Sequence, residues 1–215
     1  MKFAVVLAGC GVYDGAEIHE AVMTLLAISN NGGTYQVFAP NVMQYHVINH
    51  ITGDVMKESR NVLIESARIA RGKIKALIEY KASDFDAIIF PGGFGVAKNL
   101  CSYDIDSVDM KIDRVVEKAV RETYAAGKPI GALCISPVLI TKILGKVEVT
   151  IGNDKTTASD IKAMGGDHKE TKSGEIWIDR KNKVVTCPCY MLDATISEIA
   201  TGADKTVKAL ISLAE

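Results

Sequence analysis

The stretch that decides the fold is Lys128-Pro129-Ile130-Gly131-Ala132-Leu133-Cys134-Ile135-Ser136-Pro137. Its apolar run from Ile130 to Leu133 predicts a short buried strand, and Pro137 opens a helical pattern that continues to Ile143. Cys134 lies between them, which predicts a tight turn at the carboxyl edge of a sheet, beside the positive end of a helix dipole. That environment lowers the pKa of a thiol, and the thiolate is the nucleophile. The pattern resembles a nucleophile elbow with cysteine in place of serine, although a buried structural cysteine explains it equally well.

Apolar runs and helical periods alternate along the rest of the chain. Strands are predicted at Phe3–Ala8, Tyr35–Ala39, Ala87–Phe90 and Val147–Ile151, with a hairpin of Glu175–Asp179 and Val184–Thr186. Helices are predicted from Glu17 to Asn30, at Arg60–Gly72, Ile112–Ala126 and Thr157–Met164, and from Ile196 to Leu213. Residues 42–53 predict a hairpin or a loop, 74–78 a short strand or an arm, and 101–109 an irregular segment. This alternation indicates one α/β domain over residues 1–215, with a mostly parallel sheet between helices.

Composition narrows the class of protein. The chain has 215 residues, of which 24% are charged, and a formal net charge of -1, which argues against nucleic acid or an acidic membrane surface as a partner. No apolar run is long enough to span a bilayer, and the first apolar run is interpreted as a strand rather than a signal peptide. The five cysteines form no paired CxxC motif, and Cys187-Pro188-Cys189 alone is too weak to indicate zinc. We therefore expect a reducing compartment, the cytoplasm, and no metal site.

Three loops follow apolar strands directly: residues 9–15, residues 91–95, and the turn at Cys134. The carboxyl ends of parallel strands meet at one edge, so these loops predict the binding site. The first loop has the spacing G-x-G-x-x-x-G, and no acidic residue closes the following strand, which argues against a dinucleotide site. There is also no G-x-x-x-x-G-K-[ST] sequence of an ATPase.

The side chains around this edge suggest a catalytic arrangement. Glu17 opens the first helix, where it either complements the helix dipole or aims its carboxyl group at Cys134. A protonated carboxyl group there would donate a hydrogen bond to the thiolate and transfer protons during turnover. The backbone N–H groups of Gly93 and Ile135 are positioned to hold an oxyanion. No histidine is an obvious base for Cys134, although the loop residues His50 and His168 are within conceivable reach.

Taken together, these residues resemble the DJ-1/PfpI superfamily, which shares its fold with class I glutamine amidotransferase domains, and within it the ES1/ElbB branch. The resemblance covers essentially the whole chain and rests on Gly9–Gly15, Glu17–Ala21, Val47–His50, Arg60–Glu65, Pro91–Gly95 with Ala97–Leu100, Cys134–Pro137 and Thr150–Gly152. It implies a flavodoxin-like three-layer sandwich, a nucleophile at Cys134, a carboxyl partner at Glu17, and an oxyanion hole at Gly93 and Ile135. Further pocket candidates are Cys10, Gly11, Asn49, His50, Phe94 and His168.

The same resemblance implies a function. It is a glutathione-independent glyoxalase type of activity on small aldehydes or dicarbonyls, converting glyoxal to glycolate, with no metal or organic cofactor and usually in a homodimer. One departure matters: Thr150-Ile151-Gly152 stands where many superfamily members have a histidine, so a standard triad is not expected. Two alternatives remain open. One is a redox-sensing or regulatory protein in which Cys134 is oxidised, and the other is a cysteine amidohydrolase.

Overall fold

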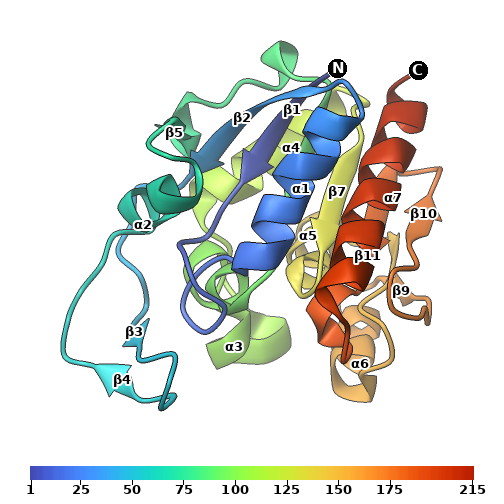
Figure 1. Cartoon of the computed structure of the whole chain (residues 1–215). Helices are drawn as coiled ribbons and strands as arrows, with labels where there is room; N and C mark the ends of the chain where they lie inside the picture. Colours follow the sequence, from blue (N-terminus) through green and yellow to red (C-terminus); the bar gives the residue numbers. More distant parts are fainter.

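The central element is a seven-stranded sheet in the order β10-β11-β7-β6-β1-β2-β5, seen in the computed structural model of residues 1–215 (Figure 1). Its strands are β1 (Lys2–Val6), β2 (Thr34–Ala39), β5 (Ile74–Ala76), β6 (Ala87–Phe90), β7 (Ile130–Leu133), β10 (Trp177–Asp179) and β11 (Val184–Cys187). All neighbours are parallel except β10 and β11, which form the expected antiparallel hairpin. The predicted mostly parallel sheet is confirmed.

Helices cover both faces of this sheet, so the molecule has three layers (Figure 1). They are α1 (Ile18–Asn30), α2 (Val62–Ile69), α3 (Tyr103–Asp106), α4 (Arg114–Ala125), α5 (Ser136–Leu144), α6 (Lys155–Ala163) and α7 (Ile196–Ala214). A π-helical turn spans Val96–Leu100, and 3-10 turns span Leu77–Glu79, Ala82–Asp84, Ser107–Asp109 and Cys189–Met191. Two small pairs lie apart from the sheet: β3 (Val47–Ile48) with β4 (Val55–Met56), and β8 (Glu148–Val149) with β9 (Asp167–His168).

The first strand shows why the layers form. Side chains alternate across a strand, so Phe3, Val5 and Leu7 enter the core cluster that α1 and α7 share. Ala4 and Val6 point the other way, into the larger cluster under α4 and α5. A strand buried on both faces needs apolar residues at every position, which explains its continuous apolar run.

Two segments differ from the sequence-based expectation. The strand predicted at residues 147–151 is reduced to β8, which pairs with β9 outside the central sheet. Backbone N–H groups of this segment donate to side chains instead of to a neighbouring strand of the central sheet. Asp179 accepts a hydrogen bond from the Glu148 N–H at 2.8 Å, and the Thr186 hydroxyl accepts one from the Thr150 N–H at 2.9 Å. Residues 101–109, expected to be irregular, contain α3 and a 3-10 turn, and Tyr103 anchors α3 by donating a hydrogen bond to Asp160.

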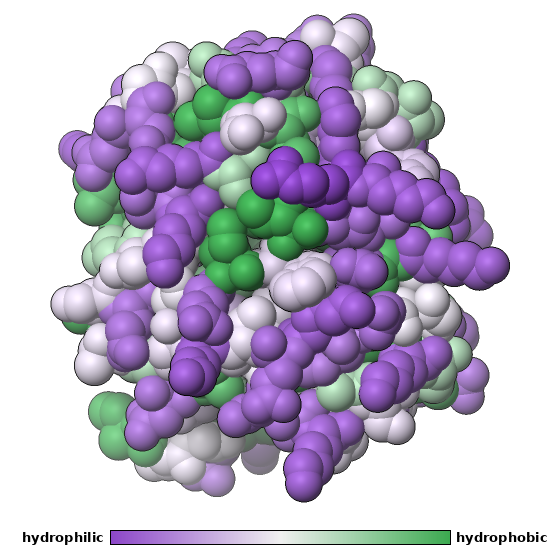
Figure 2. All heavy atoms as spheres, turned by 90° about the vertical axis from the view of Figure 1, so that its right-hand side faces the viewer, coloured by the Kyte–Doolittle hydropathy of each residue, from purple (hydrophilic) through white to green (hydrophobic).

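The surface around α7 and β10 is mostly hydrophilic, with a small apolar group near its middle (Figure 2). None of the helices has the length and apolar character needed to cross a membrane.

Candidate active site

Cys134 stands on a sharp turn between β7 and α5. Its φ is +58°, a left-handed conformation that is uncommon for a residue with a side chain. The surrounding backbone holds this conformation, because the Cys134 N–H donates to the Cys187 carbonyl at 2.9 Å. The Ser136 hydroxyl, at the start of α5, donates to the Pro91 carbonyl at 3.0 Å. The predicted strand–turn–helix geometry of an elbow is therefore present.

Two backbone donors converge on the Cys134 sulfur. They are the N–H groups of Gly93 and Ile135, the pair expected to hold an oxyanion. Gly93 adopts a φ of +101°, and a side chain there would collide with the backbone of the loop before α1. Gly92 is equally constrained, since a Cβ atom would lie 2.7 Å from Glu20 Oε2 and 3.0 Å from the Cys134 sulfur. These glycines let the loop after β6 press directly against the elbow.

Glu20 is the carboxyl group in hydrogen-bonding contact with the thiol. It is fully buried, and its two oxygens accept the N–H groups of Gly92 at 2.8 Å and Tyr190 at 3.2 Å. Burial first, and the nearby charge of Glu17 second, raise the pKa of Glu20 to about 8. At neutral pH the carboxyl group is therefore mostly protonated, and its carboxylate form, which can accept the Cys134 proton, becomes the main form above about pH 8.

Glu17 occupies a different position from the one expected. Its carboxylate caps the first turn of α1 by accepting the Glu20 N–H at 2.7 Å, and it forms part of the cavity wall beside Cys134. The two glutamates are three residues apart and lie on one face of the chain. The expectation that Glu17 supplies the carboxyl partner is corrected, because the hydrogen bond to the sulfur comes from Glu20.

The thiol is also less acidic than its sequence context indicated. Burial, followed by the charge of Glu20, raises the pKa of Cys134 well above its usual value. The Gly93 and Ile135 N–H groups act in the opposite direction, but loss of water outweighs them, since only 7% of the residue is exposed. The expected low-pKa, exposed thiol is therefore wrong, and Cys134 needs a base to become a thiolate.

A cavity of about 420 Å³ opens above the elbow. It is lined by Val12, Glu17, Gly93, Phe94, Ala97, Tyr103, Asp104, Cys134, Ile135, Asp154, Thr157, Tyr190 and Met191. Phe94 is thus the one further pocket candidate that the structure places on this cavity. Tyr190 and Met191 come from the 3-10 turn after β11, and the sequence pattern gave no signal for either.

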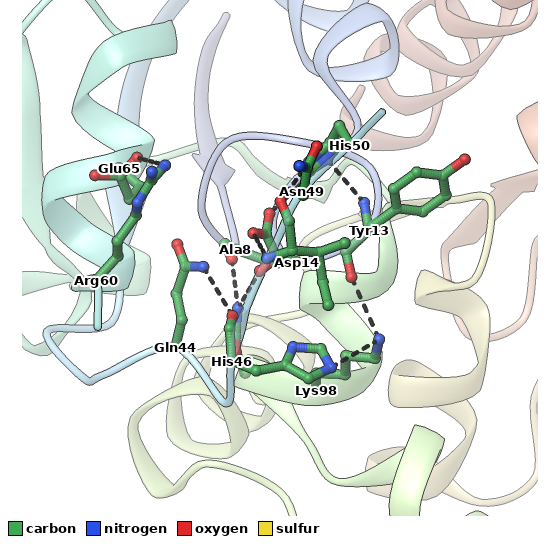
Figure 3. Close-up of polar contacts among 12 residues, drawn as sticks. Ala8, Tyr13, Asp14, Gln44, His46, Asn49, His50, Arg60, Glu65 and Lys98 are labelled. Atoms are coloured by element: carbon green, nitrogen blue, oxygen red, sulfur yellow. Dashed lines mark hydrogen bonds and ion pairs between the residues drawn. The ribbon is translucent and has the colours of Figure 1, made fainter. Parts of the chain in front are cut away.

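Two of the other candidates, Asn49 and His50, belong to a polar network around the loop after β1 (Figure 3), and Cys10 and Gly11 lie in that loop. His50 accepts the Tyr13 N–H at 3.2 Å and lies 3.1 Å from the Ile48 carbonyl, so both ring nitrogens are occupied. Asn49 stabilises its own turn by accepting the Ile51 N–H. Gly11 packs against the His50 ring, and Cys10 faces the charges of α2, where burial raises its thiol pKa.

His168 lies on β9, away from the elbow, and burial lowers its pKa. No histidine lines the cavity, and no cluster of three or more histidine, cysteine, aspartate or glutamate side chains is arranged to hold a metal ion. The chemistry available at Cys134 therefore comes from Glu20 and two backbone N–H groups.

Known proteins share this sequence and architecture. The chain is 47% identical over 222 residues to a human protein named glutamine amidotransferase-like class 1 domain-containing protein 3, mitochondrial, covering 99% of this chain and 83% of the relative. It is 37% identical over 207 residues to the zebrafish ES1 protein, mitochondrial, covering 88% and 77%. Among solved structures, an isoprenoid biosynthesis protein with an amidotransferase-like domain from Ehrlichia chaffeensis superposes with a TM-score of 0.92 at 37% identity, over 99% of both chains.

A glyoxalase III from Candida albicans shares the fold, with a TM-score of 0.63 at 14% identity over 99% of this chain and 97% of that one. The names of the human and zebrafish relatives correct the expectation of a cytoplasmic protein, because both are called mitochondrial. The sequence profile described as DJ-1/PfpI family matches residues 10–196. With relatives among the ES1 proteins and this match over most of its length, the chain belongs to the DJ-1/PfpI family.

Proposed function

We propose that the protein is a cofactor-independent enzyme of the glyoxalase type that acts on small dicarbonyl compounds through Cys134. The observation that carries this proposal is the convergence of three groups on one sulfur atom at the floor of a cavity. Glu20 contacts the thiol, and the N–H groups of Gly93 and Ile135 are directed at the same sulfur, next to which the oxygen of a bound aldehyde would lie. A thiol, a proton carrier and an oxyanion hole are what a redox-neutral rearrangement of an aldehyde requires.

The first step activates the thiol. Glu20 in its carboxylate form accepts the Cys134 proton, and the sulfur forms a bond to one aldehyde carbon of glyoxal. The carbonyl electron pair moves to oxygen, where the two N–H groups stabilise the negative charge until the oxygen gains a proton and gives a hemithioacetal. Because burial raises the pKa of Glu20 to about 8, this carboxylate is the minor form at neutral pH and its share grows as the pH rises.

Glu20 then moves a proton between carbons. The hemithioacetal carbon loses its proton to the carboxylate, and the neighbouring carbon gains one, which yields the thioester of a 2-hydroxy acid. Water adds to the thioester and releases glycolate and the free thiol. The sum is glyoxal plus water giving glycolate, with no external oxidant or reductant.

The two alternatives receive less support from the site. A cysteine amidohydrolase needs a base that can also protonate the leaving amine, and no histidine lines the cavity. A redox sensor is favoured by a low-pKa, accessible thiol, whereas burial raises the pKa of Cys134.

The test is glycolate production from glyoxal in the absence of glutathione. We expect turnover by the wild type, loss of turnover in Cys134→Ala, and full turnover in Cys101→Ser, whose buried thiol donates to the Val96 carbonyl. Glycolate formation by a folded Cys134→Ala variant at the wild-type rate would refute the proposal.

A further inference from the structure

The cavity above Cys134 has an unbalanced charge. Three carboxylate residues line it, namely Glu17, Asp104 and Asp154, and no lysine, arginine or histidine does. A cavity lined by charges of one sign concentrates ligands of the opposite sign and repels those of its own.

Each carboxylate has a structural partner that leaves it able to bind a ligand. Glu17 is 93% buried, and one oxygen caps α1 while Oε1 has no hydrogen-bond partner in the protein. Asp154 accepts the Thr157 N–H at 2.7 Å at the start of α6, and that hydrogen bond holds the pKa of Asp154 below its usual value. Asp104 Oδ2 forms a salt bridge with Lys98 Nζ at 3.6 Å, which offsets part of its charge, while Asp104 Oδ1 has no hydrogen-bond or ion-pair partner in the protein.

Aromatic rings complete the lining. Phe94, Tyr103 and Tyr190 all border the cavity. Lys98 Nζ already lies over the Phe94 ring, 4.8 Å from its centroid. Both tyrosine hydroxyls are engaged, with Asp160 at 2.7 Å and His19 at 2.9 Å, so the two tyrosines offer π-rich surface rather than free hydroxyl groups. Carboxylates combined with electron-rich rings are the chemistry that proteins use to hold organic cations.

The size of the cavity points the same way. Its volume of about 420 Å³ equals that of roughly 14 water molecules, at about 30 Å³ each. Glyoxal has only four heavy atoms, so a dicarbonyl bound at Cys134 leaves most of the space unfilled. A physiological substrate has room for a further group next to the acidic and aromatic walls.

We infer that the substrate of this site is a carbonyl compound that also carries an ammonium or another organic cation. This inference rests on the proposed carbonyl chemistry at Cys134. The carbonyl carbon lies at the sulfur, and the cation lies among the carboxylates and rings, with Asp104 and Asp154 as the specificity-determining residues. Carbonyl compounds that carry a carboxylate or phosphate are disfavoured by the same walls.

Labelling of Cys134 tests the charge selection without requiring turnover. The probes are the 2-aminoethyl, methyl and 2-sulfonatoethyl methanethiosulfonates, which are cationic, neutral and anionic. The labelling rate of Cys134 by each reagent is measured by peptide mass spectrometry. It is then divided by the rate at which the same reagent labels N-acetylcysteinamide. We expect the normalised cation-to-anion ratio to be at least about tenfold, and to fall towards one in about 1 M salt, where screening acts over roughly 3 Å. A ratio of one or below at low salt would overturn the inference.

Substitutions locate the effect. Asp154→Asn keeps the helix cap, since asparagine caps as well as aspartate, but removes the charge. We expect the ratio to fall at least about threefold in Asp154→Asn and in Asp104→Asn, and further in the double variant. Glu117→Gln, on the exposed face of α4 where Glu117 pairs with Arg121, is the matched control and leaves the ratio unchanged. A ratio that falls equally in the control would assign the effect to overall charge and overturn the inference.

Protection gives a second readout. Millimolar butylammonium should slow labelling by the neutral methyl reagent saturably, whereas butyrate at equal ionic strength should not. Charge selection without any glycolate formation would refute the glyoxalase proposal and leave the cation selectivity standing. Glycolate formation without charge selection would refute the cation selectivity and leave the glyoxalase proposal standing.

Discussion

A substitution at Glu20 distinguishes the catalytic roles of the two glutamates at the start of α1, Glu17 and Glu20. Both oxygens of Glu20 accept backbone N–H groups, and the carboxyl group also forms a hydrogen bond with the Cys134 thiol. In Glu20→Gln the single amide oxygen cannot accept from both donors, and the amide cannot take the thiol proton. We expect kcat/KM to fall about 10²- to 10⁴-fold, the usual contribution of a positioned acid–base group.

The pH profile gives the prediction its magnitude. With a pKa of about 8, Glu20 is ionised to about 9% at pH 7 and about 91% at pH 9. Because the carboxylate is the form that accepts the thiol proton, kcat/KM of the wild type should rise roughly tenfold over this range. In Glu20→Gln the bend near pH 8 should vanish.

Glu17→Gln is the matched control. Its amide oxygen can still accept the Glu20 N–H, so the cap persists and the loss of activity should stay within a few fold. The charge of Glu17 contributes to the raised pKa of Glu20, so its removal should move the bend to lower pH.

The assay is glycolate production from pH 6 to 9.5, with circular dichroism on each variant to verify folding. A bend near pH 8 that survives in Glu20→Gln would refute the role of this carboxyl group. A folded Glu17→Gln variant as inactive as Glu20→Gln would show that the assignment between the two glutamates is wrong.

Three further predictions concern packing and stability. Gly92→Ala should slow alkylation of Cys134 by iodoacetamide at least tenfold and cost about 1–3 kcal/mol of stability, because the added methyl group enters the space of the elbow; an unchanged rate would contradict the close contact. The free energy of unfolding of the wild type should fall by at most about 5 kcal/mol as the pH rises from about 4.5 to 8. The reason is that folding raises the pKa of Glu20 and therefore favours its protonated form. Urea unfolding at several pH values, with Glu20→Gln as the reference, checks this. Asp179→Ala should lower the free energy of unfolding by about 1–3 kcal/mol, because the buried Asp179 carboxylate accepts N–H groups of β8 and of the hairpin turn at Asn182. Thermal unfolding checks this, and a loss of stability no larger than that of Asp179→Asn would contradict it.

Local sequence patterns predicted most of the strands and helices and the position of Cys134 between them. A four-residue apolar run followed by cysteine and an early helical proline has few structural solutions, so the position of Cys134 between β7 and α5 followed from the sequence. The position of the Gly93 and Ile135 N–H groups at the elbow also followed, because main-chain donors depend on topology rather than on side-chain identity, while their role as an oxyanion hole stays a prediction.

The rest depends on three-dimensional packing. Glu17 and Glu20 lie on the same helix face, and only the rotation of α1 against β6 and the turn after β11 decides which one meets the sulfur. Tyr190 reaches the cavity through an irregular turn that carries no periodic signal. The acidity of Cys134 was misjudged because the sequence reveals the helix dipole but not the loss of water around the thiol.

The complete burial of Glu20 affects how quickly the site exchanges its proton. Of the groups that hydrogen-bond to the carboxyl group, two are backbone amides and the third is the Cys134 thiol. The sulfur is therefore the only one of these partners that can relay a proton between Glu20 and water in the cavity. When a covalent adduct occupies the sulfur, that relay to water is closed, and Glu20 exchanges protons only with the adduct. The proton that Glu20 takes from one substrate carbon is therefore kept from the solvent until it reaches the neighbouring carbon.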